Sequence, residues 1–172
     1  MVDPNKVMTF ELSPKFWSFL KSVHVQHPPK YNTRDIRITA LDPGGTTGHS
    51  TFNGHNTINV TQWNTNSIPE AYDRLVEHLN DFRPHHMRHE DYRIYEWKSA
   101  DHSWSPVHTL RWIGAIEVAA HVTKTPNTCL MASNAKKFWD DRKLDMFGIN
   151  PKGLRHGRDA LRHLLYYMCF PT

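Results

Sequence analysis

The stretch from residue 36 to residue 48 constrains the fold more than any other part of the sequence. Ile38 and Ala40 alternate with polar residues, which is the period of a strand with one buried face. The strand ends on Asp42, and Pro43 then ends the ladder because it has no N–H to donate. Glycines follow, so the backbone can turn tightly and approach another part of the chain. A carboxylate held at a strand end above such a turn is well placed to hold a metal ion.

The next segments predict an antiparallel meander followed by a helix. Residues 50–52 and 57–63 have strand patterns, and the Asn-Gly-His-Asn segment between them is a strong hairpin signal. Ser67 followed by Pro69 and Glu70 predicts the start of a helix, whose apolar period continues to Pro84.

The second half of the chain alternates between strands and helices. Strands are predicted over 92–96, which ends on an acid, and over 128–131, which is apolar and therefore expected to be buried. One helix is predicted to begin at Ser105-Pro106 and to continue through the apolar stretch 107–122. A second is predicted to begin at a Ser133-Asn134 cap, and a third to span about 155–169. The order β-β-β-α-β-α-β-α-α predicts an α/β fold with a mixed five-stranded sheet, an antiparallel meander plus parallel strands, flanked by helices.

Residues 1–33 are interpreted as an N-terminal extension, and 34–172 as a single domain. In the extension, Ser13-Pro14 predicts a helix start, and Phe16, Phe19, Leu20 and Val23 share one face of that helix. Three roles stay open for it: covering a sheet edge, contacting a second subunit or touching substrate.

Composition narrows the class of protein. A chain of 172 residues is long enough for one self-sufficient core. No apolar run approaches the length of a membrane span and no signal peptide is visible, so a cytoplasmic protein is expected, with no membrane partner. Cys129 and Cys169 are interpreted as reduced core thiols. The net charge of +4 is compatible with a polyanionic partner.

Four side chains on three elements form a candidate metal site: Asp42, Glu96, His156 and Asp159. His156 and Asp159 are spaced i, i+3 and therefore share one helix face, which His163 extends by a turn. Carboxylates gathered in this way repel one another unless a cation is present. Mg²⁺ and Mn²⁺ prefer oxygen ligands, so these are the expected cofactors.

The motifs Asp-Pro-Gly-Gly-Thr-Thr-Gly after a strand, a later strand-Glu and a final Gly-Arg-Asp-Ala resemble the RuvC-type Holliday junction resolvases of the RNase H-like superfamily. The phage-encoded members are the closest likeness, and the resemblance spans about residues 36–170. It implies a homodimer that cuts four-way DNA junctions by a two-metal-ion mechanism. Asp42 would bridge the ions, with Glu96 holding one and Asp159 the other. His156 stands where most of the family has a further acid, and would ligate metal or handle a proton.

If this site is real, threonines of the turn and nearby basic side chains are the expected DNA contacts, because phosphate binding relies on Lys and Arg. These candidates are Thr46, Thr47, Arg111, Lys136, Lys137, Arg155 and Arg158.

Other interpretations stay open. The chain could be a non-catalytic junction- or nucleic-acid-binding protein of the same fold, or a nuclease of this superfamily acting on another DNA or RNA structure. The Gly-Thr-Thr run also resembles the phosphate loop of actin-like ATPases and sugar kinases, but those need a second domain for which this chain has no room. His85, His86 and His89 suggest zinc, although a solvated helix end fits them better. Trp97, Trp104 and Trp112 are expected mostly in the core, although one or two could instead stack on unpaired bases at a junction.

Overall fold

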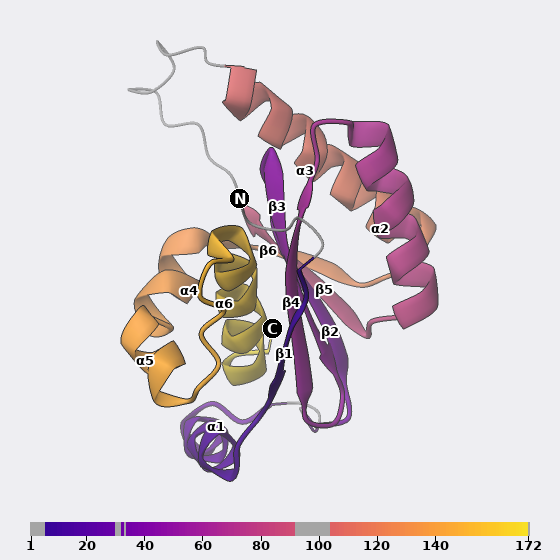
Figure 1. The fold of residues 1–172 in the computed structure, drawn as a ribbon. Helices are drawn as coiled ribbons and strands as arrows, with labels where there is room; N and C mark the ends of the chain where they lie inside the picture. The colour runs from indigo at the N-terminus through magenta and orange to yellow at the C-terminus, as the bar shows by residue number, and fades with distance from the viewer. Residues whose placement is uncertain (1–5, 30–31, 33, 92–103, 172) are drawn as a thin grey trace.

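The computed structural model describes residues 6–29, 32, 34–91 and 104–171. A single sheet runs through the middle of the molecule, with helices on both of its faces (Figure 1). The strands are β1 (Met8–Glu11), β2 (Arg37–Asp42), β3 (Thr46–Asn53), β4 (Thr57–Asn64), β5 (His86–Asp91) and β6 (Asn127–Met131). The helices are α1 (Pro14–Gln26), α2 (Ile68–Phe82), α3 (Trp104–Val122), α4 (Ala132–Phe138), α5 (Asp141–Met146) and α6 (Arg155–Cys169).

The strand order is β1-β4-β3-β2-β5-β6. The β2-β3-β4 meander is antiparallel, and β5 and β6 then add in parallel to β2, since the chain crosses over through helices between them. This confirms the predicted mixed α/β sheet. The prediction of five strands was wrong by one, because β1 pairs antiparallel with β4 and forms a sixth.

The start of the chain covers the β4 edge of the sheet and joins its core. Ser13 caps α1 by accepting a hydrogen bond from the Phe16 N–H at 3.2 Å. Phe16 and Leu20 of α1 are buried in the same cluster as β3, β4 and α6. Of the three roles left open for the extension, edge covering is therefore the one that the structure displays.

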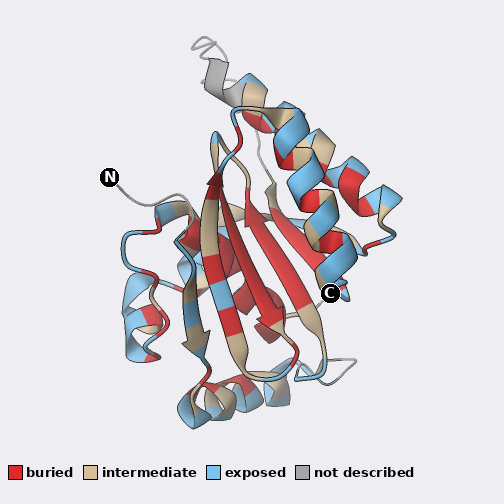
Figure 2. Cartoon of the chain, turned by 45° about the vertical axis from the view of Figure 1, so that its right-hand side comes forward, coloured by how far each residue is buried: buried red, intermediate tan, exposed pale blue. Residues whose placement is uncertain are grey.

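Each face of the sheet has its own core. One cluster lies between the sheet and α1, α4, α5 and α6, and the other lies under α2 and α3 on the opposite face (Figures 1 and 2). The central strands are accordingly buried along most of their length, as Figure 2 shows. Trp112 of α3 is fully buried, as expected, while Trp97 and the side chain of Trp104 lie outside the described part.

After helix α2, the structure differs from the sequence prediction. Helix α2 ends at Phe82, as expected, but His86 and His89 belong to β5 and are buried. The interpretation of this histidine group as a solvated helix end was therefore wrong: a parallel strand runs here, next to β2. The predicted strand 92–96, with Glu96, lies outside the described residues.

Smaller corrections concern the chain after α3. Strand β6 is an edge strand and half-exposed, so Cys129 is exposed and is not a core thiol, whereas Cys169 is buried and both thiols are free. Helix α4 begins at Ala132, with Met131 and not the Ser-Asn pair at its N-cap. Helix α5, capped by the Asp140 side chain, was not predicted. In the described part of the chain, none of the helices combines the length and apolar character needed to cross a membrane.

Candidate active site

The first turn of α6 lies directly against the meander, because two glycines leave room for it. Gly48, which pairs with Asp42 across β2 and β3, has no side chain: a Cβ there would lie 1.8 Å from the His156 carbonyl oxygen. A Cβ on Gly157 would similarly lie 2.8 Å from Val60 Cγ1. The close approach expected of the glycines after the turn is thus an approach to α6, and it carries His156 to the end of β2.

Asp42 and His156 form a direct contact at this edge. His156 Nδ1 lies 2.9 Å from Asp42 Oδ2, and Asp42 is only 7% exposed. Burial, followed by the nearby Glu90 and Asp159, raises the pKa of Asp42 from 3.8 to about 6, although the His156 hydrogen bond opposes this. The same hydrogen bond raises the pKa of His156 against the effect of its own burial. Asp42 is therefore a carboxylate whose ionised form the protein only partly stabilises.

A second acid, Glu90, comes from β5. Because β5 runs parallel to β2 with His89 opposite Leu41, Glu90 falls at the same strand end as Asp42. Its Oε2 lies 3.3 Å from His163 Nε2, and it hydrogen-bonds with Asp42. Burial alone would raise the pKa of Glu90, but the hydrogen bonds with His163 and Asp42 and the charge of Lys136 together lower it. Asp42 and Glu90 are thus neighbouring carboxyls with opposite pKa shifts, and Asp42 is the one that takes up a proton more easily.

Asp159 completes the acidic group from α6. Its Oδ1 accepts from the guanidinium of Arg162, which also donates to Asp141 of α5 and, through Nε, to the Trp139 carbonyl at 2.8 Å. Its Oδ2 lies 3.2 Å from Lys136 Nζ, and that ammonium is 3.9 Å from Glu90 Oε2. The two oxygens of Asp159 therefore have different partners, one buried and one at the surface.

Three of the four predicted site residues are thus brought together: Asp42, His156 and Asp159. Glu96 lies outside the described residues, and sequence reasoning missed Glu90. The signal for Glu90 was weak, because the strand that carries it, His-Met-Arg-His-Glu-Asp, is as polar as a loop. Only its parallel pairing with β2 makes the position of Glu90 evident.

The predicted DNA contacts divide by exposure. Arg111, Lys136, Lys137 and Arg155 are exposed, while Arg158 is half-buried with Nη1 3.4 Å from Asp141. Thr46 is half-buried. Thr47 is fully buried: its hydroxyl donates to the Gly44 carbonyl at 3.1 Å and accepts from Trp112 Nε1 at 2.8 Å, so it ties the turn to α3.

The donor set fits a divalent cation in its chemistry. Carboxylates from three elements meet at the C-terminal ends of β2 and β5. Their mutual repulsion contributes to the raised pKa of Asp42, and a bound cation would remove this cost. As the side chains lie, each acid is paired with His156, His163, Lys136 or Arg162. No group of three or more His, Cys, Asp or Glu within the described residues is arranged to hold a metal ion. Binding would therefore require exchange of at least one of these partners.

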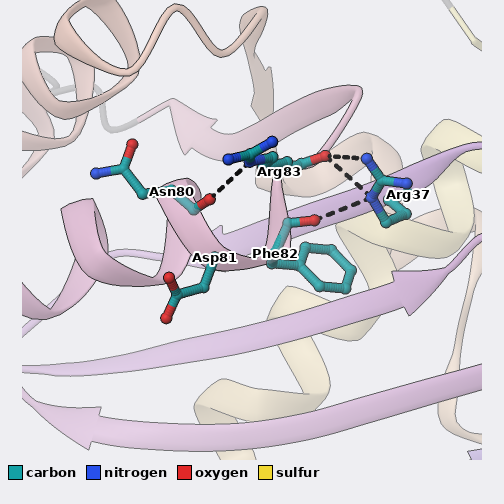
Figure 3. Close-up of a pocket in the computed structure, with 5 residues that line it drawn as sticks. All are labelled: Arg37, Asn80, Asp81, Phe82 and Arg83. Carbon is teal, nitrogen blue, oxygen red and sulfur yellow. Dashed lines mark hydrogen bonds between the residues drawn. The ribbon is translucent and has the colours of Figure 1, made fainter.

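One of the larger surface hollows lies at the other end of β2. Arg37 lines it together with Asn80, Asp81, Phe82 and Arg83 of the α2 terminus, as Figure 3 shows. Arg37 is the first residue of β2 and Asp42 the last. This hollow is therefore separate from the acidic group.

Comparison with solved structures identifies the fold. No family model and no curated protein matches the sequence. The structure resembles Thermus thermophilus RuvC in complex with Holliday junction substrate, at a TM-score of 0.63 and 16% identity over 78% of this chain and 93% of that one. A second Thermus thermophilus RuvC structure gives a TM-score of 0.59 and 17% identity over 78% and 94%.

A yeast protein gives a similar result. The mitochondrial Holliday junction resolvase Ydc2 matches with a TM-score of 0.58 and 14% identity over 91% of this chain and 86% of that one. These identities are too low to transfer an activity, but the shared arrangement of the mixed sheet and its flanking helices is clear. The chain has the RuvC-like, RNase H-like fold.

Proposed function

We propose that this chain is a metal-dependent endonuclease that cuts branched DNA, as a Holliday junction resolvase. The observation that carries the proposal is the convergence of Asp42, Glu90 and Asp159 with His156 at one edge of a RuvC-like sheet. Burial and the proximity of the other acids raise the pKa of Asp42, so the fold bears a cost for gathering them. One RuvC structure holds a Holliday junction substrate and Ydc2 is named as a Holliday junction resolvase, and these names suggest the substrate class.

In this proposal the acids hold Mg²⁺, for which Mn²⁺ can substitute. Asp42 is near both Glu90 and Asp159 and would hold metal ions together with them. Two such ions supply an activated water and stabilise the departing 3′ oxygen of a phosphodiester. His156 keeps Asp42 oriented through its Nδ1 contact and can share a proton with it. Glu96, which the family resemblance assigned to the site, stays the alternative source of the third acid.

The proposal includes a homodimer, because resolution of a junction needs two symmetric cuts. Helix α3 carries a stripe of exposed apolar residues on its outer side: Val107, Leu110, Val118 and Val122. Gly114 falls on the same side, with nothing within 4 Å of the position of a Cβ. An apolar helix face of this kind, open in the described residues of the monomer, would suit a second copy of the chain. The exposed basic residues near the acids would contact phosphates, and the phage-encoded branch stays the expected origin.

A direct test is incubation of the purified protein with a labelled four-way junction and a matched linear duplex, with Mg²⁺, Mn²⁺ or EDTA. We expect paired nicks in the junction alone, and none with EDTA. Cutting of duplex, flaps or RNA as well would keep the metal site and change the substrate to that of another nuclease of this superfamily.

A second candidate is a junction-binding protein without chemistry. The observation that favours it is the full pairing of the acids with Lys136, Arg162, His156 and His163 among the described residues. Tight junction binding with no cutting in either metal would establish that candidate and exclude the nuclease.

A further inference from the structure

The two carboxylate oxygens of Asp159 are paired with two cations that differ in burial. Oδ1 is bound by Arg162, whose side chain is 11% exposed and is also held by Asp141 and the Trp139 carbonyl. Oδ2 is bound by Lys136, whose side chain is 42% exposed and whose ammonium has no ion pair or hydrogen bond in the described part of the chain other than its two ion pairs with acids. An exposed ammonium on a flexible stem is held far less firmly than a buried guanidinium with three partners. Of the two cations, only Lys136 can leave without disturbing the core.

The Lys136 ammonium lies next to two of the acids of the candidate site. Nζ lies 3.2 Å from Asp159 Oδ2 and 3.9 Å from Glu90 Oε2, so it bridges acids from two separate elements. Helix α4, which carries Lys136, packs beside α6, which carries Asp159 (Figure 1). A monovalent cation therefore sits between two carboxylates that, under the proposed function, hold a divalent one.

We infer that Lys136 is an exchangeable internal counter-ion of the acidic site, which a divalent ion must displace in order to bind between Glu90 and Asp159. This inference rests on the proposed function and adds a regulatory element to it. The lysine balances the carboxylates while the site is without metal, and it opposes metal binding by about the strength of its ion pairs. Once displaced, its ammonium is free to meet the phosphate backbone that the site acts on, so DNA and metal favour the same rearrangement.

The test is a titration of the protein with Mn²⁺ in the absence of DNA, followed by the loss of the free-ion electron paramagnetic resonance signal. The proteins compared are the wild type, Lys136→Met and Lys137→Met. Methionine keeps the length of the stem and removes the charge. Lys137 is the matched control, since it is the next residue of α4 and is also exposed, but it lines a hollow with Phe138 and Tyr166 and has no ion pair with the acids among the described residues. Both substitutions change the net charge of the protein by the same amount.

We expect Lys136→Met to bind Mn²⁺ about 3- to 10-fold more tightly than the wild type, which corresponds to the loss of one or two exposed ion pairs. Lys137→Met should bind as the wild type does. A lysine that served only as a DNA contact or a surface charge would leave Mn²⁺ affinity unchanged. As the check on folding, all three proteins should unfold in one cooperative thermal transition in EDTA, with the midpoint of Lys136→Met lower only by the few degrees that the loss of its exposed ion pairs implies.

The outcomes separate the inference from the function on which it rests. Equal or weaker Mn²⁺ binding by Lys136→Met, with clear binding by the wild type, overturns the inference and leaves the metal site in place. Absence of Mn²⁺ binding by the wild type and both variants overturns the inference and the proposed metal-dependent function together. An equal gain in Lys136→Met and Lys137→Met would show a general charge effect and also overturn the inference.

Discussion

The two ends of β2 carry opposite charges and use them in opposite ways. At the start of the strand, Arg37 donates from Nε to the Phe82 carbonyl at 2.9 Å and from Nη2 to the Arg83 carbonyl at 2.8 Å. These carbonyls belong to the end of α2, whose last groups have no partner inside the helix. The charge of Arg37 is thus used to join a helix end to a strand (Figure 3).

At the other end of the strand, Asp42 meets further carboxyls. Burial raises the pKa of Asp42 most, and Glu90 and Asp159 raise it further, so the fold bears a cost for holding these groups together. A charge that backbone carbonyls satisfy supports the fold, whereas like charges gathered against their repulsion indicate a function. The comparison also shows why one of the larger hollows on this surface is not the best candidate site: its arginine is already committed to structure.

The largest expected effect is at the acid end. Asp42→Asn should lower the rate of junction cleavage by more than about 100-fold, because even the residues that support metal ligands cost about 10- to 100-fold when changed. Junction binding should persist, since the basic surface is untouched. The measurement is single-turnover cleavage with Mg²⁺, beside junction affinity in EDTA. Cleavage by Asp42→Asn at the wild-type rate would refute the assignment.

The next effect identifies the third acid. Glu90→Gln should lower cleavage by about 10- to 100-fold, because Glu90 hydrogen-bonds with Asp42 and shares a cation with Asp159. Glu96→Gln is the matched control and should retain most of the activity. The reverse result, a loss with Glu96→Gln alone, would return the third position to the residue that the sequence motifs predicted.

A smaller effect concerns stability and pH at the same end. Since the pKa of Asp42 is raised from 3.8 to about 6, its contribution to stability is full below pH 3.8 and is lost as the pH rises through about 6. The free energy of unfolding of Asp42→Asn, relative to that of the wild type, should therefore increase between pH 4 and pH 8. The Asp42 contribution to this increase is about 3 kcal/mol, and the raised pKa of His156, which reflects its hydrogen bond with Asp42 and is lost in the variant, adds to it. Chemical denaturation in EDTA at pH 4, 6 and 8 measures this.

The same experiment has an internal check. Added Mn²⁺ should raise the thermal midpoint of the wild type at pH 8, because a ligand of the folded state stabilises it by mass action, and should not raise that of Asp42→Asn. A constant stability difference between the two proteins across the pH range would contradict the account of the crowded carboxyls.

The smallest effect on activity is expected at the opposite end of β2. Arg37→Met should lower the free energy of unfolding by about 1–2 kcal/mol, through the loss of its bonds to the two carbonyls, and leave the cleavage rate of the folded protein unchanged. Denaturation and cleavage at a temperature well below the midpoint separate the two quantities. Loss of cleavage without loss of stability would show that Arg37 serves the reaction and not only the fold.

The sequence predicted those parts of the fold and site whose determinants are local. The alternation of apolar and polar residues predicted β2, and the Asn-Gly turn predicted the β3–β4 hairpin. The i, i+3 spacing placed His156 and Asp159 on one face of α6. The position of Glu90 depends on parallel pairing between distant segments, and the polar residues of β5 concealed the strand. The pairing of β1 with β4 and the contacts of Arg162 with Trp139 and Asp141 are likewise long-range, so no local sequence pattern predicts them.

The most direct test of the account is a crystal structure of the protein grown with Mn²⁺, with the ion located by its anomalous scattering. We expect a peak within coordination distance of Asp42 and Asp159, with Glu90 as a further ligand and the Lys136 ammonium moved away from Asp159. A structure at saturating Mn²⁺ with no peak at this edge, and with Lys136 still bridging the two acids, would contradict it.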